Sequence, residues 1–495
     1  MFFTSTRSCC SIKSASAIAK GLADDGGLFV PENFPVFSAE DINRMLGMDY
    51  QGRAVEVLSR YLTDFSTEEI SCCVKAAYSG KFDDDTPAPL VEVAPGMNLL
   101  ELWHGPTCAF KDMALQLLPH LLTASVAKVS SGRTTVILVA TSGDTGKAAL
   151  DGFADVEGTK IIVFYPQNGV SDMQKLQMTT QQGKNVAVCA INGNFDNAQS
   201  GVKVIFSDKE MAAKLDAAGM DFSSANSINF GRLVPQIVYY VSSYCDLVKS
   251  GRIALGDAFN VVVPTGNFGN ILAAYYAKQM GIPIKKFICA SNRNNILTDF
   301  INTGVYDRNR EFFTTTSPSM DILISSNLER LLYQLAGKNT QEISKLMQQL
   351  KNEGRYSVDG AMLNALQQEF YGGCADDTEA AGAIKLLFDK YNYLCDTHTA
   401  VAVSVYQKYL AETKDDTCCV IASTASPYKF APAVLEAVTG KTACGNGFDI
   451  VEELSAVTGT SVPAPLAGLA KKEVLHTSCV EKENMADFIT SFLGV

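Results

Sequence analysis

Short runs of β-branched and other apolar residues recur through the middle of the chain, and most lead into a turn rich in Gly, Ser or Asn. None of these runs alternates polar with apolar residues, so each is expected to be buried on both faces, as in a parallel sheet covered by helices. Segments with helical spacing, such as 269–281, lie between the runs. The pattern predicts an α/β fold with sites at the carboxyl ends of the strands. The predicted strands are Thr134–Ala140, Lys160–Tyr165, Asn185–Ile191, Phe259–Val263, Phe287–Ala290 and Cys418–Ser423.

Residues 1–85 differ from this middle region. They contain amphipathic helical segments at 38–46 and 67–78, and they end in a stretch that contains prolines. A chain of 495 residues is long enough for two or three domains. We therefore predict that residues 1–85 form a separate N-terminal module, and that residues 440–495 form a tail of mixed pattern.

Charge and cysteine usage disfavour several classes of protein. The chain has 41 Lys and Arg against 53 Asp and Glu, a net charge of −12, which argues against nucleic acid or an anionic membrane as the main partner. No apolar run approaches the ~18–20 residues that span a bilayer. The 14 cysteines are scattered without a Cys-x-x-Cys motif, and only four histidines are present, so neither a disulfide framework nor a metal site is expected. We predict a cytoplasmic protein with reduced thiols.

The segment Glu101–Gln116 contains the first candidate for chemistry, Lys111. A Gly-Pro-Thr turn precedes it and the following residues favour a helix, so Lys111 should lie in a first helical turn among apolar neighbours. Burial lowers the pKa of a lysine, which is what an amine nucleophile needs. A surface lysine that pairs with Asp112 would fit the same residues, and this segment alone does not decide between the two.

A glycine-rich turn follows the strand predicted at 259–263. It leads directly into a helix, so successive backbone N–H groups can converge on an anion at the helix N-terminus. The chain has neither a Gly-Lys-Ser/Thr loop nor a G-x-G-x-x-G motif here, which disfavours nucleoside triphosphates and dinucleotides. Such a turn is also common where no ligand binds. Its residues are Gly266, Asn267, Phe268, Gly269 and Asn270.

A second loop of this kind follows the strand at 134–140 and holds Ser142, Gly143, Asp144 and Thr145. Its hydroxyl and N–H groups can hold a carboxylate. The charge of Asp144 would repel such a ligand. We therefore expect Asp144 to cap the helix, to bond a ring hydroxyl or to hold the shape of the loop.

Two more segments supply polar groups. Thr424 follows the strand at 418–423, where an ordinary turn would look the same. Asn226, Ser227 and Arg232 place an amide, a hydroxyl and a guanidinium close together, and this set suits a phosphate monoester because Arg offers two hydrogen bonds and a fixed charge. An exposed polar helix start would have a similar sequence.

Together these segments resemble threonine synthase, a pyridoxal-phosphate enzyme with the fold of the tryptophan synthase β-chain (fold type II). The resemblance covers nearly the whole chain in order. It begins at Ser5, so a transit peptide is not expected, although the first twenty residues are basic and lack acids. The matching segments are STRS at 5–8, GLADDGGLFVPE at 21–32, HGPTCAFKDMALQ at 104–116, ATSGDTGKAA at 140–149, VSDMQKLQM at 170–178, GNFDNAQ at 193–199, NSINFGR at 226–232, PTGNFGNILAAYYAKQMG at 264–281, NRNNILTDF at 292–300, SPSMDILISSNLERL at 317–331, DTHTAVA at 396–402 and STASPYKF at 423–430.

The resemblance implies a domain plan and a role for each candidate residue. It implies two doubly wound parallel-sheet domains in a catalytic core at 86–440, with a smaller mobile α/β subdomain at about 127–207, and a C-terminal extension at 441–495. Ser426 and Cys108 depart from the residues that are common in the family at these positions. In the implied site Lys111 carries pyridoxal 5′-phosphate as a Schiff base, and Thr424 faces the pyridine nitrogen. The cofactor phosphate is bound by Gly266, Asn267, Phe268, Gly269 and Asn270. The substrate carboxylate is received by Ser142, Gly143, Asp144 and Thr145, and the substrate phosphate is held by Asn226, Ser227 and Arg232.

The implied reaction is the conversion of O-phosphohomoserine and water to L-threonine and phosphate, with Lys111 as general base. The alternative is a phospholyase that releases 2-oxobutyrate, phosphate and ammonia from the same substrate. A catalytically inactive relative that only binds ligands is disfavoured by the intact Lys111 and the complete loop at 266–270. The implied assembly is a monomer or a homodimer.

Overall fold

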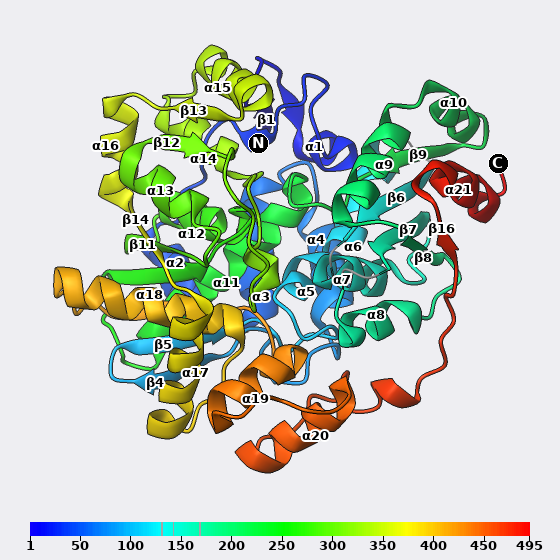
Figure 1. Ribbon diagram of the computed structural model, residues 1–495. Coiled ribbons are helices and arrows are strands. Elements are labelled where there is room, and N and C mark those ends of the chain that lie inside the picture. The colour runs from blue at the N-terminus through cyan, green and yellow to red at the C-terminus, as the bar shows by residue number, and fades with distance from the viewer. Residues whose placement is uncertain (130–131, 142, 168–169) are drawn as a thin grey trace.

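The computed structural model describes residues 1–129, 132–141, 143–167 and 170–495, in which two large sheets are covered by helices (Figure 1). Two small antiparallel sheets accompany them, β2-β1-β3 near the N-terminus and the pair β12 (Val305–Asp307) and β13 (Arg355–Ser357). Among the described residues the larger sheet has the order β14-β11-β10-β15-β5-β4, and only β4 is antiparallel to its neighbour. The smaller sheet, β16-β8-β7-β6-β9, is parallel throughout. The strands are β4 (Leu90–Ala94), β5 (Met97–Glu101), β10 (Phe259–Pro264), β11 (Ile284–Ser291), β14 (Phe370–Cys374) and β15 (Cys419–Ser423) in the larger sheet, and β6 (Thr134–Ala140), β7 (Thr159–Pro166), β8 (Val186–Ile191), β9 (Met220–Ser223) and β16 (Cys479–Val480) in the smaller one.

Every strand predicted from the sequence is present, and β6 has the predicted bounds. Successive residues of a strand point to opposite faces, so a doubly covered strand should contribute to two cores. In β6, Ile137 and Val139 pack into one buried cluster, whereas Val136 and Leu138 pack into another. The uninterrupted apolar runs thus reflect burial on both faces.

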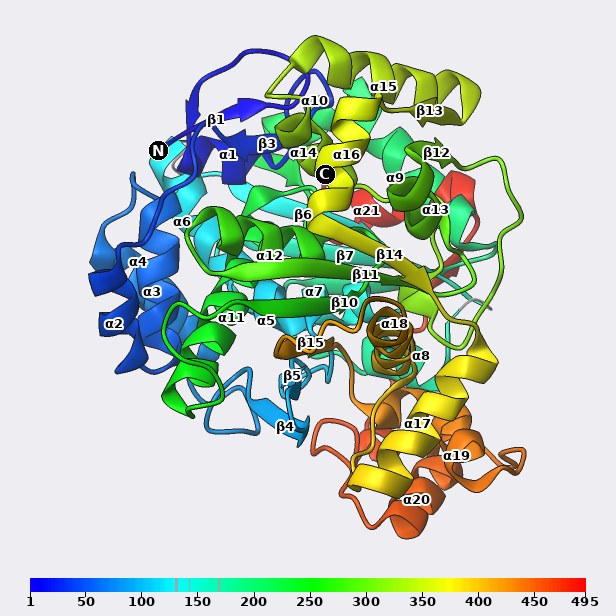
Figure 2. The ribbon, with the colours of Figure 1, turned by 90° about the vertical axis from the view of Figure 1, so that its left-hand side faces the viewer.

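Helices on both faces of the larger sheet complete this burial (Figure 2). α12 (Gly269–Gln279) shares its cluster with Val261 and Val263 of β10, and α18 (Thr397–Thr413) shares the opposite cluster with Val262. α11 (Phe230–Lys249) packs beside α12 and is buried along nearly its whole length. The other helices of the core are α5 (Lys111–Leu115), α6 (Leu118–Val129), α7 (Asp144–Phe153), α8 (Asp172–Thr179), α9 (Phe195–Ser207), α10 (Lys209–Ala217), α13 (Ile296–Thr303), α14 (Leu328–Leu335), α15 (Thr340–Glu353), α16 (Gly360–Glu369), α17 (Asp377–Tyr391) and α19 (Ala431–Thr439).

The N-terminal segment packs against these core helices. Its helix α3 lies against α11, where the Arg53 guanidinium is 2.6 Å from a carboxylate oxygen of Asp246. Arg7 pairs with the buried Glu329 of α14 at 2.7 Å. The boundary near residue 85 stays a prediction. The elements of this segment are β1 (Phe2–Ser5), β2 (Ile12–Lys13), α1 (Ser14–Lys20), β3 (Phe29–Pro31), α2 (Ala39–Leu46), α3 (Tyr50–Tyr61) and α4 (Thr67–Tyr78).

The C-terminal segment runs from the larger sheet to the smaller one (Figure 1). α20 (Gly447–Thr458) packs on α19, and further along β16 pairs with β8. α21 (Met485–Leu493) then joins the buried cluster under the smaller sheet. The smaller sheet therefore includes β9 and β16, which lie outside the subdomain predicted at about 127–207. The mobility of that subdomain stays a prediction.

None of the helices in the described residues combines the length and the apolar content that a membrane crossing requires. All fourteen cysteines are described, and each is a free thiol.

Candidate active site

Lys111 is the first residue of α5, as predicted. The turn before it is held to the end of β15, because the Phe110 N–H donates to the Thr424 carbonyl oxygen at 2.8 Å. The Lys111 Nζ lies 3.1 Å from the Ser319 hydroxyl oxygen and 3.5 Å from a carboxylate oxygen of Asp144. Burial lowers the pKa of Lys111, the nearby cations Lys429 and Arg232 add to this, and Asp144 opposes it. The amine is therefore poised to lose its proton more easily than a surface lysine.

Asp112 does not pair with Lys111, so that alternative is wrong. The Asp112 carboxylate accepts hydrogen bonds from the Thr107 N–H at 2.8 Å and the Thr107 hydroxyl at 2.6 Å. These bonds fix the turn that leads into α5. Burial nevertheless raises the pKa of Asp112 to about 7.

Cys108, in the same turn, adopts a left-handed φ of 56° and is buried, and burial raises the pKa of its thiol. Cys108 is thus an inert packing residue here.

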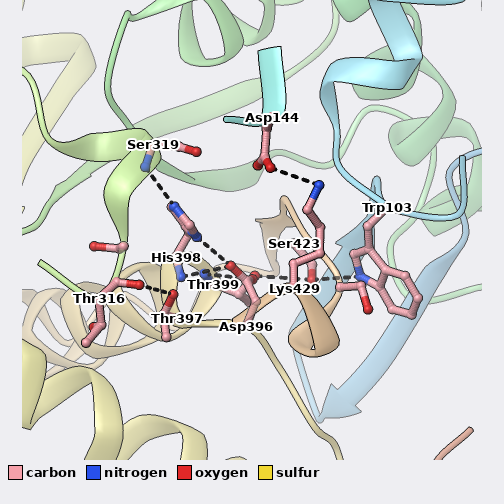
Figure 3. Close-up of polar contacts among 12 residues, drawn as sticks. Trp103, Asp144, Thr316, Ser319, Asp396, Thr397, His398, Thr399, Ser423 and Lys429 are labelled. Atoms are coloured by element: carbon pink, nitrogen blue, oxygen red, sulfur yellow. Dashed lines mark hydrogen bonds and ion pairs between the residues drawn. The ribbon is translucent and has the colours of Figure 1, made fainter. Parts of the chain in front are cut away.

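Asp144 begins α7 and forms a buried ion pair that was not predicted from the sequence. One carboxylate oxygen lies 2.8 Å from the Nζ of Lys429 (Figure 3). The same oxygen accepts a hydrogen bond from the Gln174 side chain at 3.0 Å. Lys429 also donates to the Thr107 carbonyl oxygen at 2.8 Å. Although burial opposes it, the two neighbouring lysines and these hydrogen bonds hold the pKa of Asp144 well below its usual range. The charge of Asp144 is thus neutralised by Lys429. Asp144 makes no capping bond to α7, so the interpretation of this residue as a helix cap is wrong.

The loop around Asp144 is shaped by its neighbours. The Thr141 hydroxyl oxygen accepts hydrogen bonds from the N–H groups of Gly143 and Gly146, both at 3.0 Å. Gly143 has a φ of 147°, and a Cβ there would lie 2.4 Å from the Gln174 side chain, so glycine is required. Thr145 is half-buried in the first turn of α7. Ser142, predicted to bind substrate, lies outside the described residues.

The loop at 266–270 connects β10 to the N-terminus of α12, as predicted. Phe268 takes a left-handed φ of 63° immediately before the helix. The Asn270 amide is buried; its oxygen accepts a hydrogen bond from the Tyr240 hydroxyl, while its nitrogen has no partner among the described residues. An orphaned buried donor at a helix N-terminus suits a phosphate group. Gly266 lies against Ser319, whose carbonyl oxygen would be 2.6 Å from a Cβ at that position.

Arg232 is buried in the first turn of α11, so the interpretation as an exposed helix start is wrong for this residue. Its guanidinium donates to the Ala225 carbonyl oxygen at 2.8 Å, and burial lowers its pKa to about 10. Among the described residues no carboxylate lies within 4.0 Å of it. A buried cation without a counter-charge is costly, which indicates that an anionic ligand completes the site.

The other two residues of that predicted set differ in exposure. Ser227 is half-buried, and its hydroxyl oxygen accepts a hydrogen bond from the Asn327 amide at 2.9 Å. Asn226 is exposed. Thr424 is buried at the end of β15, and no partner for its hydroxyl is present among the described side chains. That hydroxyl is therefore available to a ligand.

Models of known families match three consecutive parts of the chain. Residues 2–78 match the model "Threonine synthase N terminus", 94–424 match "Pyridoxal-phosphate dependent enzyme", and 399–489 match "Threonine synthase, C-terminal". The chain belongs to the threonine synthase family of pyridoxal-phosphate-dependent enzymes.

Individual members of the threonine synthase family agree with this result. Human threonine synthase-like 1 is 43% identical over 435 residues, which are 86% of this chain but 58% of the human protein, so the chain spans well under two thirds of that relative. Threonine synthase of Saccharomyces cerevisiae is 37% identical over 467 residues, 88% of this chain and 89% of the yeast protein. The crystal structure of pyridoxal-phosphate-bound threonine synthase from Brucella melitensis covers 99% of both chains with a TM-score of 0.89 and 35% identity.

Family membership confirms the predicted fold class and the predicted cofactor. The residues present fit pyridoxal phosphate: Lys111 offers an amine of lowered pKa, Asn270 an orphaned amide and Thr424 an available hydroxyl. The individual roles of these residues stay predictions. No role was predicted from the sequence for Lys429, Ser319, His398 or Asp396, although all four lie in segments that resemble the family.

Proposed function

We propose that this member of the family is a threonine synthase that converts O-phosphohomoserine and water to L-threonine and phosphate. The observation that carries the proposal is the buried, uncompensated Arg232 beside Lys111, in addition to the anion site at Asn270. A pyridoxal-phosphate enzyme whose amino-acid substrate lacks phosphate needs one anion site for the cofactor phosphate and one for the substrate carboxylate, which we assign to the loop at 266–270 and to the start of α7. Arg232 is a third site for an anion, which supports a substrate that carries a phosphate as well.

In this proposal the residues have distinct tasks. Pyridoxal phosphate supplies the electron sink that stabilises negative charge on the substrate. Lys111 holds the cofactor and then takes the proton from the substrate Cα, a task that its lowered pKa favours. The loop at 266–270 would hold the cofactor phosphate, and Thr424 would offer its hydroxyl to the ring nitrogen.

The substrate is held by the remaining groups. Arg232 and Ser227 would bind its phosphate, and the N–H groups at the start of α7 would bind its carboxylate. Because Lys429 neutralises Asp144, this acid does not repel the substrate carboxylate, which removes the difficulty that the sequence raised. The second candidate is the phospholyase, and it uses the same groups. The human relative that is 43% identical is named threonine synthase-like 1 rather than threonine synthase, so its name does not assign threonine as the product.

Product analysis separates the candidates. The purified enzyme, loaded with pyridoxal phosphate, is incubated with O-phosphohomoserine, and threonine, 2-oxobutyrate and phosphate are measured together. We expect threonine and phosphate in equal amounts. Equal amounts of 2-oxobutyrate and phosphate would identify a phospholyase. If no phosphate is released, O-phosphohomoserine is not the substrate, while the cofactor assignment would stand.

Replacing Arg232 by glutamine is expected to reduce kcat/KM for O-phosphohomoserine by about 10- to 100-fold, because hydrogen bonds to a charged partner are lost. Steady-state kinetics measure the loss, and inorganic phosphate should inhibit the variant more weakly than the parent. The absorbance of the bound cofactor should not change. Arg133→Gln removes a guanidinium that pairs with Asp221 at the surface, and it serves as the matched control. Equal kinetics in Arg232→Gln and the parent would contradict the phosphate site.

A further inference from the structure

The segment 315–321 lies between Lys111 and the loop at 266–270. Ser319, in the short 3₁₀ turn Pro318–Met320, places its hydroxyl oxygen 3.1 Å from the Lys111 Nζ. The Ser319 carbonyl oxygen faces Gly266, where only a residue without a Cβ fits. Ser319 therefore contacts both the amine of Lys111 and the loop proposed to hold the cofactor phosphate.

A buried histidine fixes Ser319 through its backbone. The Ser319 N–H donates to Nε2 of His398 at 3.1 Å, and the other ring nitrogen lies 2.7 Å from a carboxylate oxygen of Asp396 (Figure 3). A backbone N–H can only donate, so Nε2 is the unprotonated nitrogen and Nδ1 carries the hydrogen that is donated to Asp396. His398 is thus neutral.

Other bonds tie the rest of the segment down without using the Ser319 hydroxyl. The Thr397 hydroxyl donates to the Thr316 carbonyl oxygen at 2.7 Å, and the Asn292 amide donates to the Ser317 hydroxyl oxygen at 2.9 Å. Among the described residues, Lys111 is the one hydrogen-bond partner of the Ser319 hydroxyl. A serine kept for its structure alone would be expected to bond its own segment, as Ser317 does. The Ser319 side chain instead points to the reactive amine.

We propose that Ser319 is a further catalytic residue, whose hydroxyl holds the Lys111 amine in place, and that His398 and Asp396 are positioning residues that act through the Ser319 N–H. The inference rests on the proposed role of Lys111 as general base. When the Cα–H bond breaks, its electron pair stays with the substrate and the proton forms a new N–H bond on Nζ. The Ser319 oxygen accepts a hydrogen bond from the resulting ammonium group, while Asp144 supplies the opposite charge.

Ser319→Ala is the direct test. We expect kcat to fall by about 10- to 100-fold, as for loss of a hydrogen bond to a charged group, with KM changed by less than about three-fold. The second readout does not depend on turnover. When pyridoxal phosphate is added to enzyme freed of cofactor, the visible absorbance that marks attachment to Lys111 should develop about 10-fold more slowly than in the parent. The final extent of loading should be the same.

The positioning role is tested by coupling. His398→Leu removes the acceptor for the Ser319 N–H and should reproduce both defects, whereas His398→Gln, which can place an amide oxygen near the Nε2 position, should restore most of the loss. The double variant Ser319→Ala, His398→Leu should be no slower than the slower single variant, because both act through one bond. Ser404→Ala removes a buried hydroxyl further along α18 and should change neither rate.

Two results would overturn the inference. One is a parental rate of cofactor attachment and a parental kcat in Ser319→Ala. The other is a double variant in which the losses of the two single variants add. That result would show that His398 stabilises the fold in general and does not act through Ser319. Ser319→Ala removes a single oxygen from a half-buried side chain, so the test remains decisive if His398→Leu fails to fold. Failure of the proposed function has a different signature, because the parent enzyme would then release no phosphate from O-phosphohomoserine. Failure of the role of Lys111 would show as visible absorbance that still develops in Lys111→Ala.

Discussion

Lys111→Ala is expected to abolish the visible absorbance of the lysine-bound cofactor and to lower turnover of O-phosphohomoserine by at least about 10³-fold. The variant loses the amine that holds the cofactor and also the general base, and the base alone is typically worth 10²- to 10⁴-fold. The residues that the structure describes offer no substitute at this position. Lys429, the other lysine that contacts Asp144, is held by that carboxylate and by the Thr107 carbonyl oxygen.

Absorbance spectra and single-turnover assays on the purified variant measure these effects. Lys160→Ala is a suitable control, because Lys160 is a partly buried lysine on β7 whose amine lies over the Phe492 ring. An added small primary amine should restore a fraction of the turnover in Lys111→Ala, since the pocket then contains a replacement base. Retained absorbance and turnover in Lys111→Ala would refute the central assignment.

The sequence predicted the strands that are buried on both faces and missed others for a physical reason. β14 contains Gly372 and Gly373, and these glycines weaken any strand signal. The structure shows why they are needed: a Cβ at 372 would meet the backbone of Thr298 at 3.2 Å, and one at 373 would meet Val405 at 2.6 Å. Close packing of neighbouring helices thus selects residues that conceal the strand. β16 has only two residues and exists through its pairing with β8.

For the site, the sequence could identify loops but not contacts between them. Each anion loop has a local signature, a buried strand followed by glycine and a helix, and these were found. The relay from Lys111 through Ser319 and His398 to Asp396 joins three segments far apart in the chain, so no local pattern contains it. Two local signals for buried polar groups were available. One is the pair Asp396-x-His398 at a helix start, and the other is Lys429 between the aromatic residues Tyr428 and Phe430.

Asp144 shows the same limit most clearly. Its sequence context allowed a helix cap, a ligand for a ring hydroxyl or a support for the loop, because all three depend on what faces the carboxylate. The structure places Lys429 there, at 2.8 Å from one oxygen, and this determines both the charge and the location of the acid. A buried carboxylate beside an anion site is tolerable only with such a partner.

Lys429→Met is therefore expected to have the second largest effect. It leaves the Asp144 carboxylate buried with one partner fewer, and breaking a buried ion pair from one side costs about 3–5 kcal/mol of folding free energy. Chemical denaturation of the variant and the parent at neutral pH measures this loss. The double variant Lys429→Met, Asp144→Asn removes both charges and should recover most of the lost stability, whereas equal stability of Lys429→Met and the parent would contradict a buried ion pair.

The same substitution should shift the pH dependence of turnover, with a sign that follows from the charges around Lys111. Lys429 lowers the pKa of Lys111 by repulsion, and Asp144 raises it by attraction. Removing Lys429 takes away one of the groups that oppose Asp144, and burial and Arg232 remain. The pKa of Lys111 therefore rises, and less of the amine is neutral at a given pH. The acid limb of the kcat profile, which reports groups that titrate in the substrate complex, should move to higher pH. In the double variant Lys429→Met, Asp144→Asn the attraction between Asp144 and Lys111 is also gone, so the acid limb should move back to lower pH. An acid limb that stays in place in both variants would show that the amine of Lys111 does not limit turnover.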